Sequence, residues 1–241
     1  MAGRRRIALY GGTFDPVHVG HTAVARGLLE LFALDEVLFI PAYVAPHKRG
    51  RRVSPPLHRH AMLALATQGE RRFRVSSVEL EAPERPYTVE TLTRFQQSAE
   101  AESSRLFFVM GADSWEEITT WREWERVLTM CDQLVVTRPG HGLGTAHVTE
   151  EIRGRIVDAR GASRELVEGE LARASGTRIY LTDVARVDLS ATDVRTAAGT
   201  GRAGALEGLV APAVAEYISK YELYGEGNGA EFSDAGTNRT H

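Results

Sequence analysis

Two glycines and two histidines lie close together near the start of the chain, in the stretch Gly11–His21. The glycines allow the backbone to turn tightly and to approach a ligand, and a helix predicted just beyond them offers unpaired N–H groups and a partial positive charge. His18 and His21 stand at that helix start with the i, i+3 spacing that lets both imidazoles face one side and donate to phosphate oxygens. The stretch therefore predicts a phosphate site suited to a triphosphate.

Two later patches carry residues that could serve the same site. Ser190 opens a short predicted helix and Arg195 follows in it; alone, the serine is most simply an N-cap, while the planar guanidinium suits phosphate. Asp113 follows an apolar strand and could equally be an N-cap or a ligand contact. For Asp15, before a proline in a tight turn, hydrogen bonding to backbone N–H groups is favoured over a metal-ligand role.

The two end patches together resemble the signatures of a known family. Gly11–His21 is similar to G-G-T/S-F-D-P-x-H-x-G-H of the nucleotidyltransferase superfamily, in the full form found in the nicotinate-nucleotide adenylyltransferase family. Leu189–Arg195 resembles the family's I-S-S/A-T-x-x-R, with leucine replacing isoleucine. The resemblance runs from Ile7 to about Leu223. It implies transfer of the adenylyl group of ATP to nicotinate mononucleotide by direct in-line attack without a covalent intermediate, giving deamido-NAD and pyrophosphate in NAD biosynthesis.

The resemblance also implies how ATP would be bound. His18, His21 and Arg195 are the implied catalytic residues, with His21 the main one. The implied ATP-binding residues are Gly11, Gly12, Thr13, Phe14, His18, Gly20, His21, Gly111, Asp113, Ser190, Thr192 and Arg195. Mg²⁺ is the implied cofactor; because no carboxylate cluster is visible in the sequence, we expect the substrate phosphates and water to hold it, with no protein ligand.

A second group of residues is implied for the mononucleotide: Lys48, Tyr87, Thr88, Trp121 and Arg138. By resemblance, Trp121 stacks on the pyridine ring, Tyr87 and Thr88 hold the nicotinate carboxylate, and Lys48 lies near the mononucleotide phosphate. Arg138 is expected to line either phosphate or adenine. Without the resemblance, an aromatic side chain would be read as core and a basic run as a solvated loop.

Other functions fit parts of the pattern. The acceptor could instead be nicotinamide mononucleotide or phosphopantetheine, and a non-catalytic ATP-binding sensor would keep the fold without turnover. The intact His18, His21 and Arg195 argue against the sensor. A fragment of a class I aminoacyl-tRNA synthetase shares an H-x-G-H element, but the required Lys-rich second signature is not visible.

Short apolar runs alternate with helical patterns along the chain. The runs predicted as buried strands are Ile7–Tyr10, Val37–Ile40, Phe73–Val78, Leu106–Met110, Leu134–Thr137 and Ile179–Leu181. The helical spacings are Val24, Leu28 and Leu31, then Met62, Leu65 and Ala66, then Val89, Leu92 and Phe95. These predict an α/β, Rossmann-like nucleotidyltransferase fold, an open and mostly parallel sheet with helices on both faces. Gly11, Gly111 and Arg138 all follow strand ends, so right-handed crossovers would gather them at one edge.

Two segments depart from this alternation. Residues 140–176 are rich in charge, and we expect a surface elaboration ending in a helix over Ser163–Ala174. Trp115–Met130 is expected to be one polar helical segment, with Trp124 in the core. Residues 1–224 are assigned to a single nucleotidyltransferase domain. Residues 225–241, with little to bury, are expected to form a disordered tail.

Composition limits the other classes. The 241-residue chain carries a formal net charge of −3, which gives no general attraction to nucleic acid or anionic membrane. The single cysteine, Cys131, excludes an intrachain disulfide and suits a reducing compartment. With no export signal and no long apolar run, we expect a cytoplasmic protein that neither enters a membrane nor binds nucleic acid. A homo-oligomer is compatible with the sequence, which does not define an oligomeric state.

Overall fold

The computed structural model describes residues 4–43, 53–82, 86–98, 103–137, 143–184, 187 and 189–225. Within them, one sheet contains seven strands: β1 (Arg5–Gly12), β2 (Glu36–Pro41), β3 (Phe73–Val75), β4 (Ser104–Gly111), β5 (Asp132–Val136), β6 (Ile156–Asp158) and β7 (Ile179–Thr182). Their order in the sheet is β3-β2-β1-β4-β5-β7-β6, and every pair is parallel.

The middle of the sheet is where the strand order reverses. β1 pairs with β2 on one side and with β4 on the other, so that Gly12 lies opposite Pro41 and Tyr10 opposite Val109. In open α/β sheets, ligands collect outside the carboxyl ends of the strands at such a switch point. The fold therefore brings the chain after Gly12 and the chain after Gly111 to one place, as the sequence predicted.

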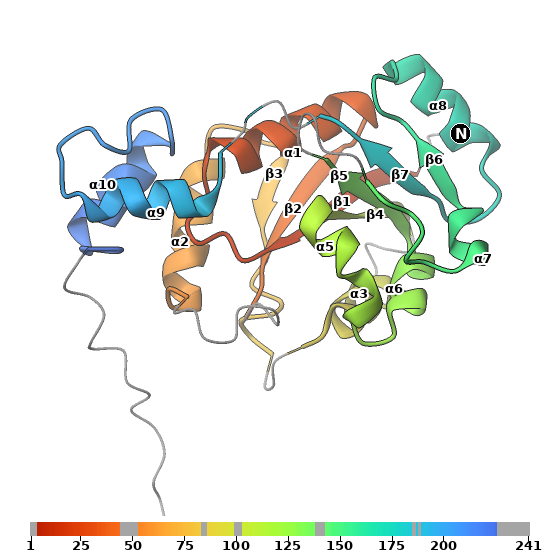
Figure 1. The fold of residues 1–241 in the computed structure, drawn as a ribbon, viewed down its shortest axis with the longest axis horizontal. Helices are drawn as coiled ribbons and strands as arrows, with labels where there is room; N and C mark the ends of the chain where they lie inside the picture. Colours follow the sequence, from red (N-terminus) through yellow and green to blue (C-terminus); the bar gives the residue numbers. More distant parts are fainter. Residues whose placement is uncertain are drawn as a thin grey trace, which may run out of the picture.

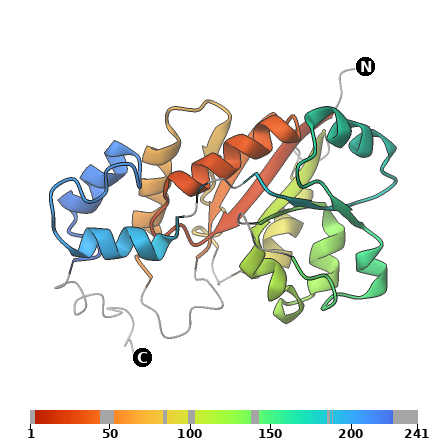
Figure 2. The same ribbon diagram turned by 45° about the horizontal axis from the view of Figure 1, so that its top comes forward.

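Helices cover both faces of the sheet (Figures 1 and 2). Their bounds are α1 (Val19–Leu31), α2 (Pro56–Thr67), α3 (Thr88–Gln96), α5 (Ala112–Glu116), the 3₁₀ helix η1 (Ile118–Thr120), α6 (Trp124–Met130), α7 (Glu150–Arg153), α8 (Arg164–Arg173), α9 (Ala191–Gly199) and α10 (Pro212–Lys220). Side chains of successive residues in β1 point to opposite faces of the sheet. Ile7 and Leu9 pack in a core with residues of α3 and α6, whereas Ala8 packs with residues of α1, α2 and α8.

All six predicted strands are present, although β3 ends at Val75 rather than at Val78, and the three predicted helical patterns lie in α1, α2 and α3. The segment Trp115–Met130 is not one helix. It is divided into α5, η1 and α6, and Glu123 before α6 has a left-handed backbone with φ of 51°. Trp124 is half-buried against the same core as α3.

The prediction that residues 140–176 form only a surface elaboration was wrong. Their described part supplies β6 at the sheet edge and α8 against α1, and it buries Val148, Ile152, Val167 and Leu171. These apolar residues are widely spaced because α7 buries only Ile152 and α8 only Val167 and Leu171. The predicted helix over Ser163–Ala174 is confirmed as α8, with Ser163 as its N-cap.

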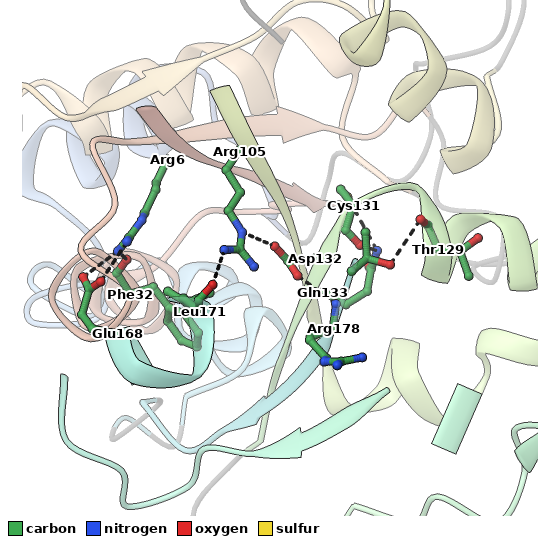
Figure 3. Close-up of polar contacts among 11 residues, drawn as sticks. Arg6, Phe32, Arg105, Thr129, Cys131, Asp132, Gln133, Glu168, Leu171 and Arg178 are labelled. Atoms are coloured by element: carbon green, nitrogen blue, oxygen red, sulfur yellow. Dashed lines mark hydrogen bonds and ion pairs between the residues drawn. The ribbon is translucent and has the colours of Figure 1, made fainter. Parts of the chain in front are cut away.

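Two arginines tie α8 to the sheet (Figure 3). Arg6 in β1 donates through Nη1 to Glu168 Oε1 at 2.6 Å and through Nη2 to Oε2 at 2.8 Å. Arg105 in β4 donates to Asp132 Oδ2 at 2.6 Å and to the Leu171 carbonyl at 2.9 Å. These contacts lie at the amino ends of the strands, opposite the edge where β1 and β4 release their loops.

The packing of α8 gives a test of this corrected assignment. Leu171→Ala is expected to lower the free energy of unfolding by about 2–5 kcal/mol, because the leucine is 4% exposed and its loss leaves a cavity. Leu166→Ala in the same helix removes a side chain that is 65% exposed and should change it by less than about 0.5 kcal/mol. Urea denaturation measures both. Equal, small changes would mean that the segment is an appendage after all.

Candidate active site at the carboxyl ends of β1 and β4

Gly11 and Gly12 end β1, and their role is to leave room rather than to make the turn. A Cβ added at Gly12 would lie 2.9 Å from the Phe14 ring, and one at Gly11 would lie 3.2 Å from Phe108. The residue that turns the chain is Phe14, with φ of 49°. The expectation that the glycines provide the turn was therefore wrong. Phe14 is 2% exposed, so its ring belongs to the core and only its main chain is available to a ligand.

His18 and His21 form the centre of the site. His18 is the N-cap of α1, and its main-chain N–H donates to Nδ1 of His21 at 3.2 Å. The two rings lie 3.8 Å apart between centroids, and the His21 ring also meets Phe14 edge-on at 5.0 Å. Because Nδ1 of His21 accepts a hydrogen bond, Nε2 is the nitrogen that carries the proton in the neutral ring. His21 is thus held as a hydrogen-bond donor through Nε2.

Asp15 has the structural role that its position before Pro16 predicted. Its carboxylate is buried and accepts from the Ser54 N–H at 3.3 Å and from the Tyr224 hydroxyl at 2.7 Å. Burial and the Asp15 charge raise the pKa of Tyr224 well above its usual range, which keeps the phenol protonated as a donor. The carboxylate therefore fixes the loop after β1 to Ser54 and to Tyr224, which follows α10.

The second motif meets the first directly. Arg195 in α9 donates through Nη1 to the Asp15 carbonyl at 2.6 Å and through Nη2 to Thr192 Oγ1 at 2.9 Å. Ser190 is the N-cap of α9, and its hydroxyl is engaged in a capping box with Asp193. The simple capping interpretation of Ser190 is thus confirmed. The Ser190 hydroxyl donates to Asp193 Oδ2 at 2.6 Å and accepts from the Asp193 N–H at 3.2 Å, so its proton is already engaged within the chain.

Beyond β4, Gly111 and not Asp113 is the N-cap of α5, so the capping interpretation of Asp113 was wrong. Asp113 is the second residue of the helix, it is exposed, and its carboxylate has no hydrogen-bond partner within the described residues. It remains available to a ligand at the switch point. After Asp113, the chain passes through the rest of the short helix α5 and through η1 to Trp121.

Trp121 follows η1, and Tyr87 precedes α3. The Trp121 ring is partly buried and contacts Phe108 edge-on, with 6.5 Å between centroids. Tyr87 is the N-cap of α3 and 47% exposed, and Thr88 is the first residue of that helix. Arg122 lies over the Tyr87 ring at 4.9 Å and donates to Glu90 at 3.4 Å. Arg122, the residue after Trp121, thus contacts both the side chain of Tyr87 and Glu90 in α3.

Two predicted site residues, Lys48 and Arg138, lie outside the described residues. Among the residues that are described, no group of three or more His, Cys, Asp or Glu side chains could hold a metal ion. In the same part of the chain, no helix is long and apolar enough to cross a membrane.

The sequence analysis missed one fully buried charge beside the site. Arg59 in α2 is 0% exposed and donates to the carbonyls of Thr13, Tyr43 and Ser54. Burial lowers the pKa of its guanidinium, and the charge of Asp15 opposes that effect. A signal was present, because Arg59 precedes Met62 by three residues and so falls on the apolar face of the helix.

Comparison with known proteins adds to this geometry. Residues 9–197 match the family model described as cytidylyltransferase-like. The chain is 38% identical over 226 residues to the probable nicotinate-nucleotide adenylyltransferase of Symbiobacterium thermophilum, covering 93% of this chain and 98% of that protein. It is 35% identical to the protein of the same name from a Thermoanaerobacter species, covering 91% and 94%.

A solved structure shares the fold. It is Plasmodium falciparum nicotinic acid mononucleotide adenylyltransferase complexed with NaAD, with a TM-score of 0.66 and 17% identity, covering 91% of this chain and 97% of that one. The same protein complexed with APC gives a TM-score of 0.65.

The seating of His18 can be tested at Gly20. A Cβ at this position would lie 2.9 Å from Nδ1 and 3.0 Å from Cε1 of His18. We therefore expect Gly20→Ala to displace the His18 ring, to shift the histidine ring signals in NMR spectra and to lower the free energy of unfolding by about 1–3 kcal/mol. Gly69→Ala is the control, since a Cβ there would meet no atom within 4 Å. Unmoved histidine signals in the Gly20 variant would contradict the assignment.

Proposed function

The chain belongs to the nicotinate-nucleotide adenylyltransferase family of cytidylyltransferase-like proteins, and from this premise we propose that it transfers the adenylyl group of ATP to nicotinate mononucleotide. In the proposed reaction, a phosphate oxygen of the mononucleotide attacks the α-phosphorus of ATP. The bond from that phosphorus to the oxygen bridging to the β-phosphate breaks, and pyrophosphate leaves in line. The products are nicotinate adenine dinucleotide and pyrophosphate, and no protein nucleophile takes part.

The observation that carries the proposal is the orientation of His21 at the start of α1. Its Nδ1 accepts from His18 N–H, so that Nε2 carries the proton of the neutral ring and is held as a donor in the first turn of α1. Phosphoryl-type transfers depend on aligned donors that neutralise charge as it develops on the α-phosphate and the leaving group. We assign that work chiefly to His21, with His18 packed against it.

The rest of the ATP half would be built from three strand ends. The main chain of Gly11–Phe14 and the start of α1 would face the triphosphate, with Gly20 leaving space for His18. Arg195 has N–H groups beyond the two that bind Asp15 and Thr192, and these would reach the terminal phosphates. The exposed carboxylate of Asp113, beside Gly111, is suited to a ribose hydroxyl.

The mononucleotide half would be built on Trp121 and Tyr87. The partly exposed Trp121 ring would stack on the pyridine ring, while the start of α3 at Tyr87 and Thr88 offers main-chain N–H groups and a helix N-terminus to the nicotinate carboxylate. Lys48 and Arg138 remain proposed phosphate contacts that lie outside the described residues.

Mg²⁺ is proposed to accompany ATP. The buried carboxylate of Asp15 is occupied by Ser54 and Tyr224, and the described residues hold no cluster of acidic ligands, so the fit is to an ion bound by phosphate oxygens and water. When bound, the ion would neutralise phosphate charge. The residues of the chain would then bind, orient and donate hydrogen bonds.

The acceptor and the role of His21 can be tested together. We expect pyrophosphate release from MgATP with nicotinate mononucleotide to exceed release with nicotinamide mononucleotide or phosphopantetheine. His21→Ala should lower kcat about 10²–10³-fold, because its donor matters most in the transition state. Calorimetry should show ATP binding nearly retained. Tight ATP binding by the wild type without release on any acceptor would favour the sensor alternative.

Trp121 provides a separate test of the mononucleotide half. Trp121→Ala is expected to raise KM for nicotinate mononucleotide about tenfold, the loss of one stacking contact, with little change in KM for ATP. Trp124→Ala, which removes a half-buried tryptophan from the same segment, should lower stability and leave the ratio of the two KM values unchanged. Steady-state kinetics decide the matter: equal increases in both KM values after Trp121→Ala would mean that this ring serves the core.

A further inference from the structure

A continuous line of hydrogen bonds joins the loop after β1 to the start of α3. Arg59 donates to the Thr13 carbonyl at 2.8 Å and to the Tyr43 carbonyl at 3.1 Å. The N–H of Tyr43 donates to Glu79 Oε2 at 3.2 Å, and Thr91 Oγ1 donates to Glu79 Oε1 at 2.9 Å. Tyr43 is therefore held on both sides of its main chain, by Arg59 and by Glu79.

The line ends on residues of the proposed mononucleotide half. Thr91 lies one turn into α3, and its N–H donates to the carbonyl of Tyr87 at 3.1 Å. At the other end, Thr13 lies in the loop that the proposed function assigns to the triphosphate. The line ends on two main-chain carbonyls, those of Thr13 and Tyr87. Between them it runs through Arg59, Tyr43, Glu79 and Thr91, to which the proposed function gives no ligand contact. The line thus spans the distance between the two proposed half-sites.

Arg59 and Glu79, the two charged residues of this line, lie where burial disfavours their charged forms. Arg59 is 0% exposed, and within the described residues all of its hydrogen bonds go to main-chain carbonyls. Glu79 is half-buried, and burial raises the pKa of its carboxyl. Buried charged groups are destabilising unless hydrogen bonds satisfy them, and an apolar residue of similar size would hold α2 in place at lower cost. What the two groups add over apolar residues is directional bonding to the main chain of three separate segments.

We propose that Arg59 and Glu79 are positioning residues that set the spacing between the ATP half and the mononucleotide half of the site. This inference rests on the proposed adenylyl transfer. In-line attack requires the mononucleotide oxygen and the α-phosphorus to be aligned, and a misplacement of about 1 Å costs up to about 10²-fold in rate. Each half alone would still bind its own substrate when the spacing changes.

The test compares binding with turnover. Arg59→Lys keeps the charge but cannot supply the forked donors that reach three carbonyls. We expect kcat to fall about 10- to 100-fold, while the Kd values of MgATP alone and of nicotinate mononucleotide alone, measured by calorimetry, stay within about threefold. Glu79→Ala should show the same split. Glu79→Gln should restore most of kcat, because its amide can accept from Tyr43 and donate to Thr91.

Arg105→Lys is the matched control, since Arg105 also bridges separate elements but at the opposite edge of the sheet. It should lower the melting temperature without lowering kcat at a temperature where the protein is folded. The proposal is overturned if Arg59→Lys and Glu79→Ala weaken ATP binding and leave kcat unchanged, or if Arg105→Lys lowers kcat as much as they do. If the Arg59→Lys protein does not fold, the comparison of Glu79→Ala with Glu79→Gln still tests the proposal. An inactive wild type with all acceptors would instead count against the proposed function.

Discussion

All the strands run in one direction, and this constraint decides where the described part of the chain can bind a ligand. Parallel pairing places every strand's carboxyl end at the same edge, and the reversal of strand order between β1 and β4 opens that edge at its centre. α1 and α5 begin there, so their N-termini converge without any residue being chosen for that purpose. The two histidines, Asp113 and Arg195 lie at this edge, whose position follows from the topology alone.

The opposite edge of the sheet has a different character. There, Arg6 and Arg105 join β1 and β4 to α8 through Glu168, Asp132 and a main-chain carbonyl. Partly exposed ion pairs contribute little net stability, but their forked geometry permits only one seating of the helix. The two edges thus differ: contacts at one fix the outer layer of the fold, and the other carries the residues of the proposed site.

Prediction from sequence succeeded where the information is local. The strands are apolar runs, and the His18–His21 spacing is contained in one helix turn, so both could be read without knowing the fold. Arg59 left one local signal, its place on the apolar face of α2, but its contacts with Thr13 and Tyr43 depend on how separate segments fold together. Glu79 left none, because alone it resembles an ordinary surface charge. The segment after residue 140 failed for a related reason: its buried residues are spread over short elements, none with enough apolar positions to show a period. Ser190 shows that recognising a motif does not fix the role of each residue in it, because the hydroxyl of this serine caps α9.

The contacts of Asp15 have a consequence for the order in which the protein matures. Its carboxylate meets Tyr224 and its carbonyl meets Arg195, partners that are 209 and 180 residues away in sequence. A ribosome makes the first motif well before these two partners, so a growing chain holds β1 and α1 before Arg195 and Tyr224 can contact the loop between them. Until Arg195 and Tyr224 have emerged, the loop lacks two of its contacts. The loop therefore gains all of these contacts only after residue 224 has been made, and a chain ended before Arg195 would retain the strands of the sheet without these two contacts.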